Sequence, residues 1–338
     1  MQLAEALRHV HRGGELSADQ SEAVIRGALA EAPDAVQLSG LLAMLAQRGE
    51  ATPEILGAAR ALRDMAVPFE HAAPEAIDTC GTGGDGLGTF NLSTASALVA
   101  AAAGAKVIKH GNRSISSSCG SADLLEACGV ALELSPAQAR TVFDEMGITY
   151  LHAPLYHPAM GIAGPVRRSL GIPTLFNLLG PLVNPGRVRR QVLGVAKPDR
   201  LDTYAELLSD LGHERGLVVH GGGGADELTL EDGNRSAAVG DMPAFPLDPR
   251  ELGLDAVPVA ALAGGDVAKN VSLFERLLAG DGGPLRDALL YNSAAALVVA
   301  GVCPNGTEGL RRAADAIDSG AARARLAQWA ALSQAVQA

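Results

Sequence analysis

The sequence predicts an α/β protein with a small all-helical domain and a large α/β domain, whose mainly parallel central sheet is flanked by helices. Three observations predict it. The chain has 338 residues, more than one domain usually holds. Hydrophobic residues make up 48% and aromatic residues 3%, with 40 glycines, a composition typical of small-residue helices packed on short strands. Beyond residue 75, short apolar stretches alternate with helix signals.

The first part of the chain carries helix signals with no strand pattern between them. The stretch LAEALRHV ends before Gly13, and SADQ (17–20) has the spacing of a capping box. In TPEI we expect Thr52 at the N-cap and Pro53 at the first helical position. These signals predict a helical small domain over residues 1–66.

The second part begins after a linker with two prolines, VPFEHAAPE (67–75), so we place the large domain at 67–338. Its expected strands are AIDT, AKVI, ITYLH, QVLGVA and GLVVHG. A helical, proline-punctuated segment, about 164–186, interrupts them, and we expect it to pack on the small domain and complete it. Another helix is expected to start at Asp248.

Charge and cysteine content exclude some classes of function. A net charge of −11 argues against nucleic acid or an anionic membrane as a partner. No apolar run reaches membrane length, and the N-terminal residues lack a signal-peptide pattern. The cysteines show no CxxC spacing, which favours reduced thiols and a cytoplasmic protein; they are Cys80, Cys119, Cys128 and Cys303.

A glycine loop follows the first expected strand. Gly81, Gly83 and Gly86 match GxGxxG, but a dinucleotide site needs an acidic residue about twenty positions later, and here the second strand ends in Lys109. A cation there favours a different phosphate compound. Polar residues around the start of the next helix would add hydroxyls to its free N–H groups, namely Asn91, Ser93 and Thr94. Turn and cap chemistry alone would explain the same residues without a ligand.

Two more motifs carry polar side chains. The turn KHGNRSISSSCGS, from Lys109 to Ser121, is dominated by hydrogen-bond donors and could surround phosphate oxygens; a solvated loop is the alternative. Asp226 and Glu227 follow a buried-looking strand and four glycines, where adjacent carboxylates suit Mg²⁺. A solvated turn is the alternative for this pair.

Together the motifs resemble the anthranilate phosphoribosyltransferase family. They are DTCGTGGDGLGTFNLST, KHGNRSISS, GSADLLEACG, HPAM, PVRRSLGIPTLFNLLGPLVNP, VLGV and GADELTL, in the family's order and spacing over essentially the whole chain. The resemblance implies a homodimer that transfers the phosphoribosyl group of 5-phosphoribosyl 1-pyrophosphate (PRPP) to the amine of anthranilate, a step of tryptophan biosynthesis. It also implies Mg²⁺, two ions per monomer, and an oxocarbenium-like transition state in which pyrophosphate departs.

The resemblance assigns site residues by motif. For catalysis it implies Lys109, His110, Asn112 and Arg167. For anthranilate it implies Gly81, Asn112 and Arg167, the arginine fork matching a planar carboxylate; for the metal it implies Ser93, Asp226 and Glu227. For PRPP it implies Gly81, Gly84, Asp85, Thr89, Asn91, Leu92, Ser93, Thr94, Lys109, His110, Gly111, Asn112, Arg113, Ser114, Ile115, Ser116, Ser117 and Ser121.

Two departures from the family pattern and two alternatives remain. Ser118 and Cys119 stand where a basic residue and a serine are usual, and GIAGP after HPAM lacks the usual basic residue. These departures leave the identity of the acceptor less secure than that of PRPP.

A lone histidine before proline is more often structural, so His157 is left out of the site. A pyrimidine-nucleoside phosphorylase, which needs no metal clamp, and a related nucleic-acid-binding protein are the other hypotheses.

Overall fold

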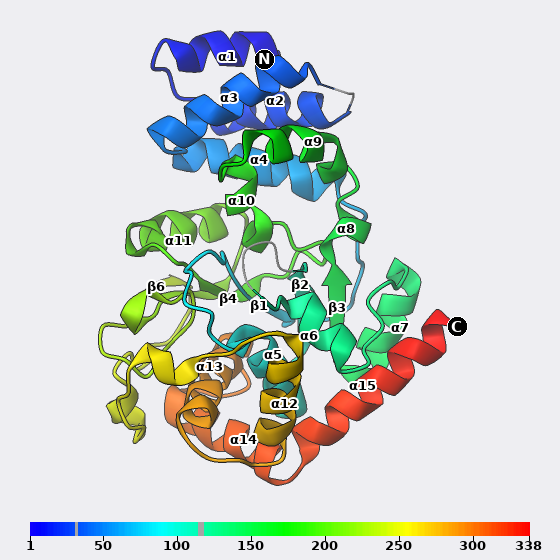
Figure 1. The fold of residues 1–338 in the computed structure, drawn as a ribbon, viewed down its shortest axis with the longest axis vertical. Coiled ribbons are helices and arrows are strands. Elements are labelled where there is room, and N and C mark those ends of the chain that lie inside the picture. Colours follow the sequence, from blue (N-terminus) through cyan, green and yellow to red (C-terminus); the bar gives the residue numbers. More distant parts are fainter. Residues whose placement is uncertain (31–32, 114–117) are drawn as a thin grey trace.

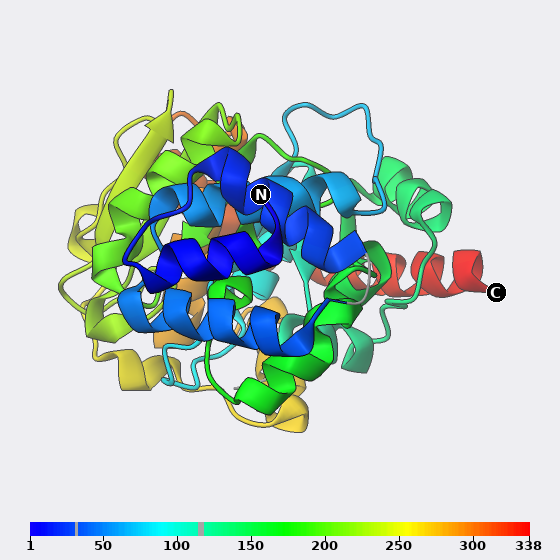
Figure 2. The ribbon, with the colours of Figure 1, turned by 90° about the horizontal axis from the view of Figure 1, so that it is seen from above.

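The structure, a computed structural model, describes residues 1–30, 33–113 and 118–338. A body of helices lies above a larger body built on one sheet (Figure 1), and this arrangement confirms the predicted fold class. Seen from above, the helical body lies over part of the larger body, while the C-terminal helix extends past it (Figure 2). The expected PRPP residues Ser114, Ile115, Ser116 and Ser117 lie outside the described residues.

The helical body combines two separate parts of the chain. Its N-terminal helices are α1 (Leu3–His11), α2 (Ala18–Ala30), α3 (Ala35–Arg48) and α4 (Thr52–Met65). Against α2 and α3 pack α9 (Met160–Leu170) and α10 (Leu175–Leu178), which share one apolar core with them. The apolar faces of α9 and α10 are buried among the N-terminal helices.

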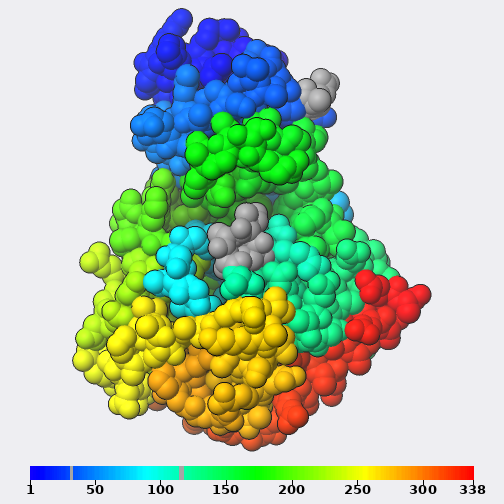
Figure 3. Space-filling view, viewed as in Figure 1, coloured from blue at the N-terminus to red at the C-terminus, as the bar shows by residue number. Residues whose placement is uncertain are grey.

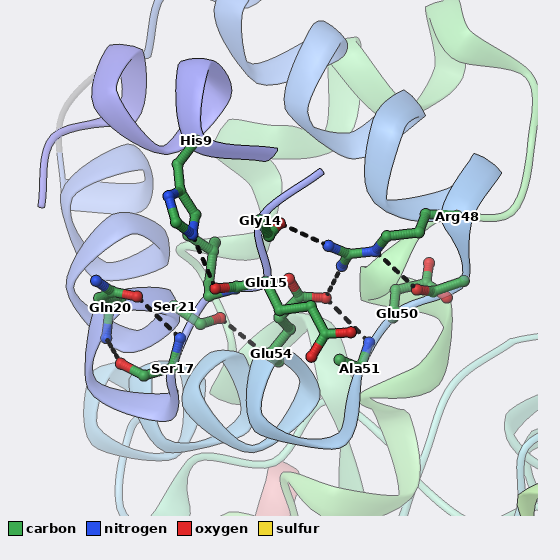
Figure 4. A network of polar contacts seen from close by, with 12 residues as sticks. His9, Gly14, Glu15, Ser17, Gln20, Ser21, Arg48, Glu50, Ala51 and Glu54 are labelled. Carbon is green, nitrogen blue, oxygen red and sulfur yellow. Dashed lines mark hydrogen bonds and ion pairs between the residues drawn. The ribbon is translucent and has the colours of Figure 1, made fainter. Parts of the chain in front are cut away.

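Buried polar groups of the helical body are bonded to one another (Figure 4). The carboxylate of Glu54, which has no exposed surface, accepts hydrogen bonds from Leu16 N (3.0 Å), Ala51 N (2.9 Å) and the Arg48 guanidinium. The expected N-cap at Thr52 is wrong, since α4 begins at Thr52 and Ala51 is its N-cap. Glu54 at the third helical position satisfies the Ala51 N–H, so no cap side chain is required.

Six strands form the sheet of the large body. They are β1 (Ile77–Gly81), β2 (Val107–Gly111), β3 (Ile148–His152), β4 (Arg190–Gly194), β5 (Arg215–His220) and β6 (Arg235–Gly240), in the order β3-β2-β1-β4-β5-β6. The five expected strands are parallel, and β6 joins the edge antiparallel to β5. The sequence analysis missed β6, because RSAAVG at a largely exposed edge carries almost no apolar signal.

Helices cover both faces of this sheet. On the face toward the helical body lies α11 (Leu201–Asp210). The other face packs into a core built around α13 (Pro284–Ala300), which is buried nearly throughout, with α5 (Leu92–Ala102), α6 (Ser121–Ala127), α7 (Pro136–Met146), α12 (Val267–Leu278), α14 (Gly306–Asp318) and α15 (Ala321–Gln337). The helix expected at Asp248 is one short 3₁₀ turn, Pro249–Leu252, capped by Asp248.

Three chain segments connect the two bodies, namely 66–76, 153–159 and 183–189, the second of which contains the short α8 (Ala153–Tyr156). Val67 N donates to Tyr156 O (2.8 Å), and Phe69 N donates to Pro185 O (3.3 Å). The three segments therefore form one hydrogen-bonded junction. Among the described helices, none has the length and hydropathy needed to cross a bilayer.

Candidate active site

A cleft of about 1260 Å³ lies between the helical body and the carboxyl edge of the sheet. The surface is hollowed between α9 and the large body (Figure 3). Side chains from both bodies line it. Among the expected site residues these are Gly81, Gly84, Asp85, Asn91, Ser93, Thr94, Lys109, His110, Gly111, Asn112, Arg113, Ser121, Arg167 and Asp226.

Two paired glycines allow the acidic loop to reach this edge. Gly81 ends β1 opposite Gly194 at the end of β4, where the strand order reverses. A Cβ on Gly81 would lie 2.0 Å from Asp226 Oδ2, and one on Gly194 would lie 1.5 Å from Asp226 O. Asp226 also accepts a hydrogen bond from Gly83 N (2.7 Å) in the glycine loop. The glycines are thus required for close packing, at the switch point where α/β sheets bind ligands.

The start of α5 presents polar groups to the cleft. The helix begins at Leu92, so Ser93 and Thr94 stand in its first turn. Of the N–H groups there, Leu92 N donates to Phe90 O (2.6 Å) and Thr94 N donates to Asn91 O (3.1 Å). The buried Thr94 Oγ1 has no hydrogen-bond partner in the described structure. Asn91 is held by Cys119 O (3.0 Å) and Asn270 Nδ2 (2.9 Å). An unpartnered hydroxyl at the positive end of a helix suits an anionic ligand.

Lys109 is a buried cation beside the cleft. Its ammonium donates to Thr79 O, and only 2% of the residue is exposed. Burial lowers the pKa of Lys109, whereas the charge of Asp78 counteracts that shift. A nearly desolvated cation interacts strongly with any phosphate that reaches it, because little water screens the pair.

Without a bound cation, ionisation of both Asp226 and Glu227 is unfavourable. Burial, and next the charge of Asp85, raise the pKa of Asp226 to about 6. Burial, and next the charge of Asp226, raise the pKa of Glu227 well above its usual range. Glu227 Oε1 finds no hydrogen-bond partner among the described residues. A divalent cation would remove both penalties.

A second, small cavity fits such an ion. It has a volume of about 20 Å³ and is lined by Ser93, Asp226 and Glu227, among other residues. One water or one ion occupies a space of this size. Two carboxylates and a hydroxyl are a donor set suited to Mg²⁺, which completes its shell with water and substrate phosphate. The residues present therefore fit magnesium.

His110 and His157 both line the cleft and are in contact with each other. The His110 ring packs edge-on against His157, with centroids 5.1 Å apart. Burial, and next the proximity of His157, lower the pKa of His110 to about 3, while burial lowers the pKa of His157 to about 4. Both rings are therefore neutral at physiological pH. Nothing in the described structure bonds His110 Nε2, which can accept a hydrogen bond from a ligand.

Arg167 is the one expected site residue that lies in the helical body. The guanidinium on α9 stands over the Phe176 ring, 5.5 Å from its centroid. Burial lowers the pKa of Arg167. Within the described chain this guanidinium has no acidic partner, unlike most other arginines. A partly buried, unpaired fork in a cleft suits a carboxylate ligand.

Two residues of the donor-rich turn, Arg113 and Ser118, are held by hydrogen bonds. Arg113 forms a two-pronged ion pair with Glu126 of α6 (2.7 and 2.8 Å) and a longer contact with Asp123. Ser118 donates to Gly265 O (2.7 Å). Arg113 therefore lines the cleft with its charge already paired, and the unusual Ser118 has a structural role.

Some expected residues stand apart from the cleft. Leu92 is fully buried in the core, so only its main chain could face a phosphate. Thr89 lines neither cavity but hydrogen-bonds the Glu227 carboxylate. Of the GIAG departure, Gly161 and Gly164 line the cleft near Arg168 without side chains of their own.

Sequence reasoning missed further cleft residues. His157, expected to be structural, lines the cleft, and so do residues of α10, of the turn before α11 and of α11 itself; they include Phe176, Lys197, Arg200 and Tyr204. For His157 the signal was its place in YHPAM, just before the segment that carries Arg167. No periodicity marks the others, since the meeting of two bodies brings them together.

Comparisons with known proteins extend these findings. Residues 4–66 match the helical bundle domain of a glycosyl transferase family, and residues 73–323 match its a/b domain. An anthranilate phosphoribosyltransferase of Roseiflexus sp. is 46% identical over 330 residues, 96% of each chain. One named anthranilate phosphoribosyltransferase 2 from Streptomyces coelicolor is 45% identical over 93% of each.

Solved structures are also similar over almost the full length. The crystal structure of anthranilate phosphoribosyltransferase from Thermus thermophilus shares 45% identity with a TM-score of 0.91, covering 97% of this chain and 99% of that one. The Saccharomyces cerevisiae enzyme in complex with PRPP and Mg shares 26% identity with a TM-score of 0.90, covering 98% of both chains.

Proposed function

The chain belongs to the anthranilate phosphoribosyltransferase family, and we infer from this that it transfers the 5-phosphoribosyl group of PRPP to the amine of anthranilate. The products are N-(5-phosphoribosyl)anthranilate and pyrophosphate, in a step of tryptophan biosynthesis. Among the relatives, the yeast enzyme has been solved with PRPP and Mg and with 4-fluoroanthranilate. The relatives and solved structures described above are all named anthranilate phosphoribosyltransferases.

One observation carries the assignment of substrates to this cleft. Four kinds of group that favour a polyanion and its cation face one edge of the sheet: the glycine loop, the first turn of α5, Lys109, and the Asp226–Glu227 pair. Two of their buried polar atoms, Thr94 Oγ1 and Glu227 Oε1, lack partners in the described protein. Buried polar atoms are normally bonded, so a ligand that bonds them is expected here.

The PRPP residues act through placement and charge. The pyrophosphate of PRPP would lie against the N–H groups of the glycine loop and of α5, with Lys109 beside it. Mg²⁺, held by Ser93, Asp226 and Glu227, would supply charge that stabilises the departing pyrophosphate. Preorganised donors of this kind are each worth about 3 kcal/mol in the transition state. Asn112, Gly111 and Ser121 complete the wall on the turn side.

The anthranilate side requires orientation more than proton removal. The aniline amine is neutral at physiological pH, so its lone pair is available to form the C1–N bond while the C1–O bond to pyrophosphate breaks, its electron pair leaving with the oxygen. Arg167 would bind the carboxylate of anthranilate, and Gly81 and Asn112 border the same space. His110, neutral because of its lowered pKa, would accept a hydrogen bond from the amine and hold it toward C1.

A single assay tests the function. Anthranilate fluorescence is followed with PRPP and Mg²⁺ and with each component omitted, and the product is identified by mass. Loss of fluorescence only in the complete mixture, and its suppression by EDTA, are expected. Turnover that persists in EDTA, or nucleoside cleavage by phosphate in place of transfer, would contradict the proposal.

The finer features are proposals of the same kind. We propose a cytoplasmic homodimer with two magnesium ions per monomer, and a closing motion of the helical body over both substrates. Light scattering after size exclusion measures whether the protein is a dimer. Calorimetric titration with magnesium and PRPP measures the number of ions per monomer. Small-angle scattering that shows no compaction with PRPP, Mg²⁺ and an anthranilate analogue would exclude closure.

A further inference from the structure

The sheet opens between two of its central strands. β1 and β2 pair in register at one position only, Ile77 with Val107, whereas β1 pairs with β4 at five positions and β2 with β3 at five. Beyond Ile77 the facing edges of β1 and β2 lack a regular ladder. Their buried main-chain groups must find other partners.

Two buried side chains occupy this opening. Asp78, 1% exposed, accepts a hydrogen bond from Asn184 Nδ2 (2.8 Å), and its other oxygen faces His110 N at 3.4 Å. Asn184 Nδ2 also donates to Ile108 O (2.8 Å). From the other strand, the Lys109 ammonium donates to Thr79 O. Side chains thus replace the missing ladder between β1 and the turn after β2.

Asn184 also joins this opening to the junction between the bodies. It belongs to the connecting segment 183–189, and its Oδ1 accepts from Gly186 N (2.8 Å). Gly186 O is bonded by His71 Nε2 (2.8 Å), from the connecting segment 66–76. Two of the three connections between the bodies are therefore held at the place where Asp78 meets Asn184.

We propose that Asp78 and Asn184 are positioning residues for PRPP, which rests on the proposed function. The carboxylate and the amide fix the Lys109–His110 turn relative to the glycine loop, and they link this turn to the segments that connect the two bodies. Neither residue lines the cleft, so both act through the turn and not by contact with substrate. Replacing either leaves the turn less well placed for the donor, while the Arg167 side of the cleft is unchanged.

Kinetics of matched variants test the proposal. Asp78→Asn keeps the shape of the side chain but offers an N–H to a position that needs an acceptor. Asn184→Ser removes the bridge and keeps Asp78, and serves if Asp78→Asn fails to fold. Glu54→Gln is the control, because Glu54 is an equally buried carboxylate that accepts main-chain N–H bonds away from the turn.

The expected result is a split between substrates. Both variants should lower kcat/KM for PRPP by about tenfold or more, since small misplacements of reacting groups have effects of this size. The KM for anthranilate at saturating PRPP should stay within about twofold, and Glu54→Gln should change neither. Equal losses for both substrates, or losses in Glu54→Gln as large as in Asp78→Asn, would overturn the proposal.

Hydrogen exchange of the substrate-free protein separates this proposal from the proposed function. Amides of 107–113 and 183–189 should exchange faster together in Asp78→Asn and Asn184→Ser, and not in Glu54→Gln. Unchanged or unlinked exchange in these segments would overturn the positioning role. If the wild-type protein shows no transfer, the proposed function fails, and exchange alone decides whether Asp78 and Asn184 couple the turn to the junction.

Discussion

Two buried carboxylates, Glu54 in the helical body and Glu227 at the sheet edge, illustrate opposite solutions to one physical problem. Glu54 is surrounded by two main-chain N–H groups and the Arg48 guanidinium (Figure 4). Glu227 lies beside Asp226 and has an oxygen without a partner in the described structure. The first carboxylate is satisfied by the fold itself. The second is satisfied only when a ligand or cation binds. A buried polar atom without a protein partner therefore indicates a binding site, whereas a fully bonded one indicates a structural role.

The largest expected effect comes from neutralising Glu227. Glu227→Gln should lower kcat/KM for PRPP by about a thousandfold, since it removes a metal ligand. It should also stabilise the substrate-free protein by about 1 kcal/mol, because a carboxyl whose pKa is raised by folding costs stability at neutral pH. That cost shrinks as pH falls below the folded pKa and is gone only below the usual pKa of a free carboxyl. Steady-state kinetics and denaturant unfolding measure the two effects.

Glu231→Gln is the control for this change. Glu231 lies on the same loop, but its carboxylate already accepts from Val259 N (2.7 Å). Activity within about twofold of wild type is expected for it, because no ligand depends on that oxygen. If the Glu227→Gln protein were active and less stable than wild type, Glu227 would have a structural role like that of Glu54, and the contrast between these two carboxylates would be wrong.

The opposite outcome is expected for Glu54. Glu54→Gln should lower the free energy of unfolding by about 3 kcal/mol, since it leaves the Arg48 charge and a buried N–H without their acceptor. The KM values should be unchanged, because the Glu54 carboxylate does not line the cleft. Thermal or denaturant unfolding, followed beside kinetics, checks both. An unaltered stability would show that the network of Figure 4 contributes little.

Arg167 extends the comparison to the acceptor side, because it is a charged group of the helical body whose partner is missing. Arg167→Ala should lower kcat/KM for anthranilate by about thirtyfold, or about 2 kcal/mol, with the KM for PRPP within about twofold. Arg168→Ala, its exposed neighbour on α9, should have little effect. If the two variants lose activity alike, or if PRPP is affected as strongly as anthranilate, Arg167 does not bind the acceptor.

The smallest effect probes the surface where the two bodies meet. His213 is buried between α11 and β5, and burial, then the charge of Arg63, lower its pKa to about 4. Below the usual histidine pKa, the unfolded chain takes up a proton that the folded protein refuses, so stability falls as pH drops from about 6.5 toward 4. His213→Asn should reduce the loss between pH 7 and 5.5 by about 1 kcal/mol, measured by denaturant unfolding. Parallel pH profiles for the two proteins would show that water reaches this contact.

Most of the sheet and much of the donor site could be predicted from local patterns. The five parallel strands follow from short apolar stretches, and the proposal that the loops bind phosphate follows from glycines, a helix start and Lys109. β6 could not be predicted, because an edge strand needs little apolar surface. Thr52 was misplaced as a cap, because a buried carboxylate from within the helix bonds the N–H that a cap would have bonded.

The roles of individual site residues were less accessible to local reasoning. Arg113 counts as a phosphate-binding cation in the sequence, yet its charge is paired with Glu126. His157 looked structural until its ring was found against His110. Asp78 and Asn184 are 106 positions apart, and the sequence around neither residue indicates that they are in contact. Pairing across a fold depends on geometry that no local pattern contains.

By itself, the sequence determined the chemistry available to this protein: which stretches become helices and strands, which loops are rich in donors, and where acids stand next to each other. Those properties depend on near neighbours in the chain, through backbone conformation and hydrophobic periodicity. Only the tertiary structure decided which of these groups are satisfied and which are left open, and how the junction between the bodies reaches the turn after β2. Burial and partner distance decide that, and both arise when segments far apart in sequence pack together.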